Sequence, residues 1–323
     1  MPSSAVHRRD HLLGVALVTG ATLFWSMTGF FTRALGTDLW TTLAGRSAFG
    51  VVMLLVLFVA ANRRESLRVF LSMGRSGVAQ AIAAVACAFF TISSLYHTSV
   101  ADNAVIGAAA PFAAALLARV VLGERIPRRT FVAGAVSLVG VGIVVSGSLG
   151  AGHLFGDLLA VGMMLAFAAM IVIARARPEM PVAPPNILAV GLNFLLAAPL
   201  ASLGSVGPVD AALLALFGLT NFVAAGTLFL SGSRRIPAAE SALIVTLDMV
   251  FGPMVVWATF AEAPTTAGLI GGAIVLAAVV GHVAAGARAG AAKTATTSSA
   301  VAAKVAPAPC AVAPPVVGDH RET

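Results

Sequence analysis

An aspartate lies inside a long apolar stretch near the end of the sequence. Asp248 is the one charged residue between positions 242 and 260. On a helix, Ser241, Asp248 and Gly252 fall on the same side. An ionised carboxylate in bilayer hydrocarbon costs at least ~2.5 kcal/mol, so such a residue normally faces a bundle interior or a wet cavity. We expect Asp248 and Ser241 to bind a cationic part of a substrate or a coupling proton. The alternative is a structural carboxylate bonded to a neighbouring helix.

Arg46 is a second charged residue within an apolar run, about two helical turns from the start of the run at residue 39. A guanidinium can hold a substrate carboxylate through two parallel hydrogen bonds, and together with Asp248 it would suit a zwitterion such as an amino acid. Alternatively, the long side chain extends toward Asp38 or water. Trp25 is a candidate apolar or stacking wall for the substrate, and Asn221 is a candidate polar cavity liner that could instead bond between helices.

Two prolines lie within apolar runs and are candidates for helix breaks. Pro111 lacks an N–H group and therefore leaves the Gly107 carbonyl without its helical donor. Transporters often place binding groups at broken helices near the bilayer midplane, although small residues also permit close packing. We expect Gly107 and Pro111 to form a hinge or break, and Gly252 and Pro253 to form another.

The amino-acid composition of the chain is that of a membrane protein, so these residues must be positioned by membrane-spanning elements. Of 323 residues, 59% are hydrophobic and 10% are charged, and the mean hydropathy is +0.97, whereas soluble domains are about 25% charged. Ten apolar runs are long enough to span a bilayer as helices, and they lack the alternation of a β-barrel. They cover approximately residues 12–33, 39–61, 77–96, 104–122, 130–148, 155–174, 186–205, 210–231, 239–260 and 266–286.

The net charge of +7 is distributed by loop. Lys and Arg residues precede the first run and follow every even-numbered run, whereas the connections after runs three, five, seven and nine have none. Arg33 is the one cation near the other surface. This pattern predicts both termini on the cytoplasmic side of an inner membrane, and it accounts for the charge without nucleic acid.

An offset of 138 residues aligns the two halves of the sequence. It places Glu124 under Glu262 (262 − 124 = 138) and Gly134 under Gly272. The arginines do not align, because each half has them where that copy would face the cytoplasm. Since each half holds five runs, an odd number, the second copy must enter the membrane from the opposite side, as in many transporters.

We therefore predict an all-α membrane protein of ten transmembrane helices, arranged as two inverted-topology five-helix repeats. The repeats cover residues 12–148 and 149–286, after a cytoplasmic N-terminus over 1–11 and before a tail over 287–323. The tail is rich in Ala, Pro, Ser and Thr, a composition typical of disorder.

Two segments carry a resemblance to a known family. They read SLYHTSVADNAVIGAAAPFAAALLARVVLGERIPRRTFVAGAVSLVGVGIVV and SGSRRIPAAESALIVTLDMVFGPMVVWATFAEAPTTAGLIGGAIVLAAVV. Each resembles the closing unit of EamA-type proteins of the drug/metabolite transporter superfamily, and weaker similarity spans residues 12–286. The sequence has Asp248 and Met249 where the family usually has Glu-Pro, and Ala261 where it usually has Gly.

The resemblance implies a secondary transporter that moves a small organic metabolite, amino-acid-like or drug-like, by alternating access, commonly as efflux. It implies a structural role at helix ends for Glu124 and Glu262. We expect a small-molecule substrate, the lipid bilayer and a candidate proton as partners, and a monomer. A facilitative channel and a non-transporting membrane receptor or scaffold are the alternatives.

An enzyme is not expected from the sequence. It contains no P-loop, and no paired carboxylates or nucleophile with a base at one depth. Cys87 and Cys310 form no metal-binding or redox motif, so we expect neither a cofactor nor a metal.

Overall fold

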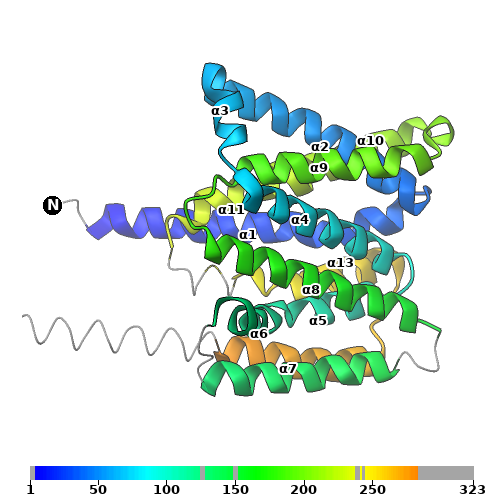
Figure 1. Ribbon diagram of the computed structural model, residues 1–323. Coiled ribbons are helices and arrows are strands. Elements are labelled where there is room, and N and C mark those ends of the chain that lie inside the picture. The colour runs from blue at the N-terminus through cyan, green and yellow to red at the C-terminus, as the bar shows by residue number, and fades with distance from the viewer. Residues whose placement is uncertain (1–3, 124–127, 148–151, 237–240, 242–243, 283–323) are drawn as a thin grey trace, which may run out of the picture. The chain divides into compact units, whose positions relative to one another are not determined.

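The computed structural model describes residues 4–123, 128–147, 152–236, 241 and 244–282 (Figure 1). Helices and turns account for these residues, without strands. The α-helices are α1 (Ser4–Ala34), α2 (Leu39–Asn62), α3 (Ser66–Leu71), α4 (Gly74–Leu95), α5 (Val100–Ala108), α6 (Ala110–Leu122), α7 (Arg128–Gly147), α8 (Leu154–Ala176), α9 (Ala183–Ala197), α10 (Pro208–Gly218), α11 (Ala225–Ser233), α13 (Asp248–Phe260) and a last helix, Thr266–His282. A π-helix, η4 (Leu219–Ala224), joins α10 to α11. Glu124 and the expected tail over 287–323 lie outside the described residues.

Eight helical segments among the described residues are long and apolar enough to cross a membrane. The helices α13 and Thr266–His282 are apolar but shorter. The ninth and tenth predicted spans, 239–260 and 266–286, extend into residues that the structure does not describe. The all-helical class is therefore confirmed, and the total of ten spans stays a prediction.

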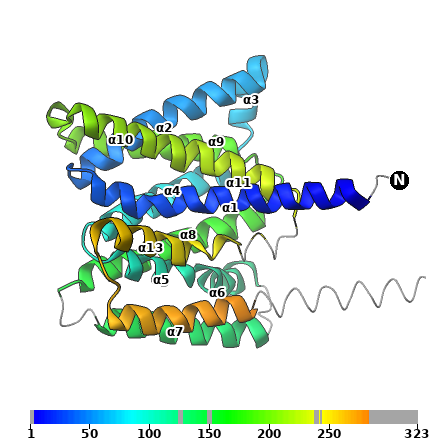
Figure 2. The same cartoon turned by 180° about the vertical axis from the view of Figure 1, so that it is seen from behind.

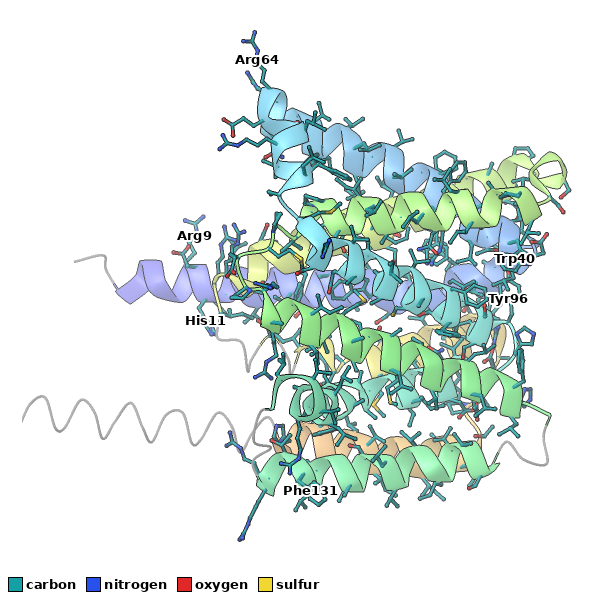
Figure 3. All side chains as sticks on the ribbon, viewed as in Figure 1. Arg9, His11, Trp40, Arg64, Tyr96 and Phe131 are labelled. Carbon is teal, nitrogen blue, oxygen red and sulfur yellow. The ribbon has the colours of Figure 1, made fainter. Side chains whose placement is uncertain are left out.

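The first helix is longer than its apolar run predicted. It begins at Ser4 rather than near residue 12, so much of the segment expected as an N-terminal extension is helical. Arg9 and Arg64 lie at one end of the bundle, and Trp40 and Tyr96 lie at the other (Figure 3). This separation agrees with the alternating charges of the loops, and the side that faces the cytoplasm stays a prediction.

Helices from the two parts of the chain interleave. α2 packs against α9, α4 packs against α8, and α1 packs against both α11 and α13. Seen from behind, α1 lies between α11 and α13 (Figure 2). Many large apolar side chains point outward, as expected where lipid replaces water. Residues far apart in sequence therefore meet along α1.

The first helix break lies between Gly107 and Pro111. α5 ends at Ala108, α6 begins at Ala110, and Pro111 lies in the first turn of α6. At the break, the Ala109 N–H donates to the carbonyl of Ile106, three residues earlier, at 3.2 Å. Proline is well tolerated in a first helical turn, where its missing N–H would have no partner in any case.

The second break, at Leu247, lies six residues before Pro253. α13 begins at Asp248 and continues through Pro253. At the break, the Leu247 N–H donates to the carbonyl of Ile244, again three residues earlier, at 3.0 Å. Pro253 removes the helical donor of one carbonyl, that of Met249, and this loss does not end the helix. The expected break at Pro253 is therefore corrected to Leu247.

The two breaks coincide at the offset of the proposed repeat. α6 and α13 are each 13 residues long, and they begin 138 positions apart (248 − 110 = 138). Each is followed by a residue with positive φ, Gly123 at 68° and Ala261 at 57°. A left-handed alanine costs roughly 1 kcal/mol, so the chain keeps the turn without the usual glycine. The local geometry recurs, and the inverted topology stays a prediction.

α7 and the last helix approach each other at their backbones. A Cβ added at Gly140 would lie 2.8 Å from the Gly271 carbonyl oxygen and 2.7 Å from Cγ2 of Val275. A Cβ added at Gly271 would lie 2.5 Å from the Gly140 carbonyl oxygen. These glycines therefore permit a helix contact that no larger residue fits.

We predict that Gly140→Ala lowers the free energy of unfolding by about 1–3 kcal/mol, because the methyl group overpacks this contact. Gly142→Ala is the matched control in the same helix, since nothing lies within 4 Å of an added Cβ there. Thermal unfolding in detergent should show a lower Tm for Gly140→Ala and an unchanged or slightly higher Tm for Gly142→Ala. Equal Tm values for both variants would contradict the close contact.

Candidate functional site

Asp248 on α13 binds Ser26 on α1. The Ser26 hydroxyl donates to Oδ1 of Asp248 at 2.6 Å, and Ser26 is buried. One turn later, a Cβ added at Gly252 would lie 3.7 Å from the Ser26 carbonyl oxygen. The side of α13 that carries Asp248 and Gly252 thus faces α1. Sequence reasoning did not identify Ser26, which lies 222 positions from its partner.

The Ser26 hydroxyl has two acceptors within reach and a single proton. Its oxygen is 2.6 Å from Asp248 Oδ1 and 2.9 Å from the carbonyl oxygen of Thr22. When Asp248 is ionised, Ser26 can donate to the carboxylate. When Asp248 is protonated, the carboxyl can donate to Ser26, and Ser26 can then donate to Thr22. Both protonation states of Asp248 therefore have a complete hydrogen bond at this contact.

Arg46 is buried between two phenylalanine rings. Its residue surface is 3% exposed. The guanidinium carbon lies 5.1 Å from the ring centroid of Phe217 in α10 and 5.3 Å from that of Phe222 in η4, both within the range of cation–π attraction. Asp38 instead accepts from the backbone and hydroxyl of Thr41 and caps α2. The expected extension of Arg46 toward Asp38 or water is therefore corrected, because the aromatic rings enclose the side chain.

The π-helix η4 brings two side chains toward the first two helices. Asn221 donates through Nδ2 to Oγ1 of Thr28 in α1, at 2.9 Å. A Cβ added at Gly50 of α2 would lie 2.5 Å from the ring of Phe222, so that glycine makes room for the ring. π-Helices insert one extra residue in a turn and occur frequently at functional sites. Asn221 therefore forms a hydrogen bond between helices, which the sequence analysis gave as the alternative to lining a cavity.

Trp25 and Ser241 lie apart from these contacts. The Trp25 ring packs against Phe229 of α11, with centroids 5.3 Å apart, so it covers a helix contact. Ser241 is buried, and its hydroxyl has no hydrogen-bond partner in the part of the chain that the structure describes. Both residues were suggested by sequence position alone, and neither is hydrogen-bonded to Asp248 in the described part of the chain.

Arg33 and Glu262 form a junction at the end of the bundle that holds Trp40 and Tyr96. Arg33 Nε donates to Glu262 Oε2 at 2.6 Å, and Nη2 donates to Oε1 at 3.2 Å. Arg33 also donates to the carbonyl oxygens of Leu95 and Thr98. The Val100 N–H, at the start of α5, donates to Glu262 Oε1 at 3.0 Å. Glu262 therefore joins the end of α13 to the ends of α1, α4 and α5.

The electrostatics of this junction favour an ionised Glu262. Partial burial by itself raises the pKa of the carboxyl, but the hydrogen bonds from Arg33 and Val100 and the charge of Arg33 outweigh it, so the pKa is lowered from 4.5. Sequence analysis noted Arg33 and Glu262 separately. The sequence predicted that both residues lie at the same side of the membrane, but it did not predict that they form an ion pair.

Asp248 and Arg46 have separate neighbours. Asp248 is bonded to Ser26 of α1, whereas Arg46 lies beside Phe217 and Phe222. No ion pair between Asp248 and Arg46 occurs in the described part of the chain.

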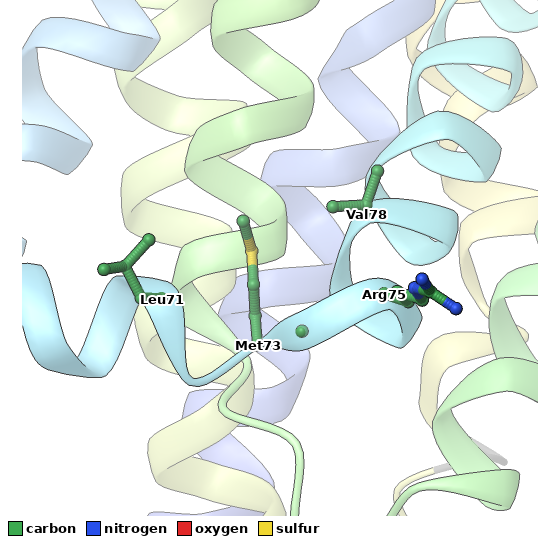
Figure 4. Close-up of a pocket in the computed structure, with 5 residues that line it drawn as sticks. Leu71, Met73, Arg75 and Val78 are labelled. Carbon is green, nitrogen blue, oxygen red and sulfur yellow. The ribbon is translucent and has the colours of Figure 1, made fainter.

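Asp248 and Arg46 are not part of a candidate metal site or of the surface pocket among the described residues. Among the described residues, no group of three or more His, Cys, Asp or Glu side chains could hold a metal ion. A pocket at the turn between α3 and α4 is lined by Leu71, Met73, Gly74, Arg75 and Val78 (Figure 4). It contains neither Asp248 nor Arg46.

Comparisons with known proteins identify a family for the first part of the chain. Residues 12–146 match the model of the EamA-like transporter family. A solved structure described only as "Crystal structure of protein" is 21% identical and has a TM-score of 0.50, and the match covers 84% of this chain and 95% of that chain. This likeness concerns the fold alone. No curated protein matches the chain.

We predict that Glu262→Gln lowers the free energy of unfolding at pH 7 by about 1 kcal/mol, because a neutral amide replaces the carboxylate beside Arg33. A carboxyl with a lowered pKa contributes stability that is complete above its ordinary pKa and is lost as the pH falls through the folded value. The Tm difference between the natural protein and Glu262→Gln should therefore shrink as the pH falls from about 6 to below 4.5.

Glu65→Gln, at an exposed residue, is the control for this pH series. It should leave the Tm close to that of the natural protein at every pH. A Glu262→Gln difference that stays constant or grows at acidic pH would contradict the ionised junction.

Proposed function

We propose that this chain, whose residues 12–146 match the EamA-like transporter family, is an efflux transporter of the drug/metabolite transporter superfamily. Its described helices are those of a multi-pass membrane protein, and the matched family consists of transporters rather than enzymes. In the proposal it moves a small organic metabolite, amino-acid-like or drug-like, across the cytoplasmic membrane by alternating access.

The observation that carries the proposal is the contact between Asp248 and Ser26. Asp248 begins the helix that follows a break in an apolar segment, and its carboxyl accepts a hydrogen bond from Ser26, in a helix of the first half. A carboxylate at membrane depth that joins two halves can couple its protonation to their relative movement. The two hydrogen-bonding choices of Ser26 allow Asp248 to gain or lose a proton without an unsatisfied partner.

The recurring break geometry supports alternating access. α6 and α13 begin at equivalent positions of the proposed repeat and have equal lengths. Transporters of inverted repeats commonly change access by rocking one repeat against the other around a site at the broken helices. In this proposal, the breaks at Ala109 and Leu247 are the hinges.

The test is transport by purified protein in liposomes. We would load proteoliposomes with a mixture of amino acids, nucleosides and vitamins and identify, by mass spectrometry, the solutes that leave faster than from empty liposomes. Saturation and counterflow of the released solute distinguish a transporter from a facilitative channel. If no solute leaves at any pH gradient, the result contradicts transport and favours a receptor or scaffold.

We predict that Asp248→Asn reduces this efflux at least tenfold and abolishes its dependence on pH, because the amide cannot exchange a proton. Asp10→Asn is the matched control, since Asp10 is exposed near the start of α1, and it should leave efflux unchanged. Both variants should insert and unfold like the natural protein. Unchanged, pH-dependent efflux by Asp248→Asn would return Asp248 to a structural role.

A further inference from the structure

Arg46 carries a buried charge for which the described protein provides no anion. Its Nε–H has no hydrogen-bond partner, and no ion pair joins its guanidinium to a carboxylate in the described part of the chain. Arg33, by contrast, is bonded to the carboxylate of Glu262 and to the carbonyl oxygens of Leu95 and Thr98. The protein therefore supplies hydrogen-bond acceptors and an anion to Arg33, whereas the described residues supply neither an anion nor an acceptor for Nε to Arg46.

The neighbours of Arg46 hold the guanidinium in place without neutralising it. Phe217 and Phe222 contact it from α10 and η4, and the thiol of Cys87 in α4 lies within electrostatic range. Cation–π contacts contribute about 0.5–2 kcal/mol each, whereas a buried charge without a partner costs several kcal/mol. The aromatic contacts therefore orient the group but do not compensate its burial.

The backbone around Arg46 is arranged so that these contacts form. A Cβ added at Gly218 would lie 2.3 Å from the Arg46 carbonyl oxygen, and one added at Gly50 would lie 2.5 Å from the Phe222 ring. α2 and α10 therefore meet directly beside the arginine. The π-helix that follows Gly218 carries Phe222, so an irregular turn sets the position of one ring.

We infer that Arg46 is the binding group for the carboxylate of the transported solute. Buried charges in proteins are normally paired, and a guanidinium with a free Nε–H can bind a carboxylate through two parallel hydrogen bonds. This inference rests on the proposed transport function and specifies its substrate class as organic monocarboxylates, including amino acids. Asp248 is not part of the anion site, because its carboxyl is hydrogen-bonded to Ser26.

A monoanion fits this site better than a phosphate. The site offers one positive charge, flanked by the apolar faces of Phe217 and Phe222. A phosphate dianion would keep an uncompensated charge beside these rings, whereas a carboxylate would be neutralised. The flanking rings also suit an apolar group next to the carboxylate.

The first experiment measures the cost of Arg46 without any ligand. Replacement of an unpaired buried charge by an apolar side chain of similar length is often stabilising, so we expect Arg46→Met to raise the Tm in detergent by about 2 °C or more. Arg33→Met is the matched control and should lower the Tm, because it leaves Glu262 unpaired. A fall in Tm for Arg46→Met comparable to that for Arg33→Met would overturn the inference, since Arg46 would then be structural.

The second experiment measures stabilisation by defined probes. The natural protein, Arg46→Met and Arg46→Lys would be unfolded thermally with the standard amino acids, the corresponding amino-acid amides, isovalerate and inorganic phosphate. We expect at least one carboxylate to raise the Tm of the natural protein, a smaller rise for Arg46→Lys and none for Arg46→Met. The amide of that carboxylate should be without effect.

Three results of the probe experiment would overturn the inference. They are stabilisation by amides or phosphate in place of carboxylates, equal stabilisation of Arg46→Met by the same carboxylate, and the absence of any shift with every carboxylate. The liposome measurement separates this inference from the proposed function. Efflux of uncharged solutes that Arg46→Met does not affect would retain transport and reject the carboxylate site, whereas Arg46-dependent carboxylate binding without efflux would reject transport alone.

Discussion

The hydrocarbon of a bilayer cannot solvate a charge or a free backbone group, and the arrangement of this bundle depends on that constraint. Asp248 is bonded to Ser26, and the helix breaks at Ala109 and Leu247 are closed by hydrogen bonds to carbonyls three residues earlier. Arg46 departs from this rule within the described residues, since aromatic rings replace an anion around it. That departure locates the carboxylate site inferred above.

α1 connects the first half of the protein to the second through polar contacts at successive levels. Ser26 binds Asp248 of α13, Thr28 binds Asn221 of η4, and Arg33 binds Glu262 after α13. Each of the three contacts joins residues about 200 positions apart in the sequence. A movement of one half relative to the other would have to break or exchange some of these bonds, so α1 is the helix on which the proposed change of access would act.

Glycines determine how closely the helices meet around these contacts. Gly218 allows α10 to approach the Arg46 backbone, Gly50 makes room for Phe222, and Gly140 meets Gly271 at the crossing of α7 with the last helix. Ala261 shows the opposite case: its left-handed backbone, at φ 57°, persists without glycine. The turn is held by Glu262, whose bonds to Arg33 and Val100 fix the chain that follows α13.

The sequence by itself determined the helical membrane class, the end of the bundle that collects basic residues, the break near Pro111 and the side of α13 that carries Asp248 and Gly252. Hydropathy and helical period are local properties, so they can be read from neighbouring residues. Only the tertiary structure decided that Ser26 is the partner of Asp248 and that phenylalanines enclose Arg46. These contacts join helices that are distant in the sequence, and their choice depends on how the helices pack against one another.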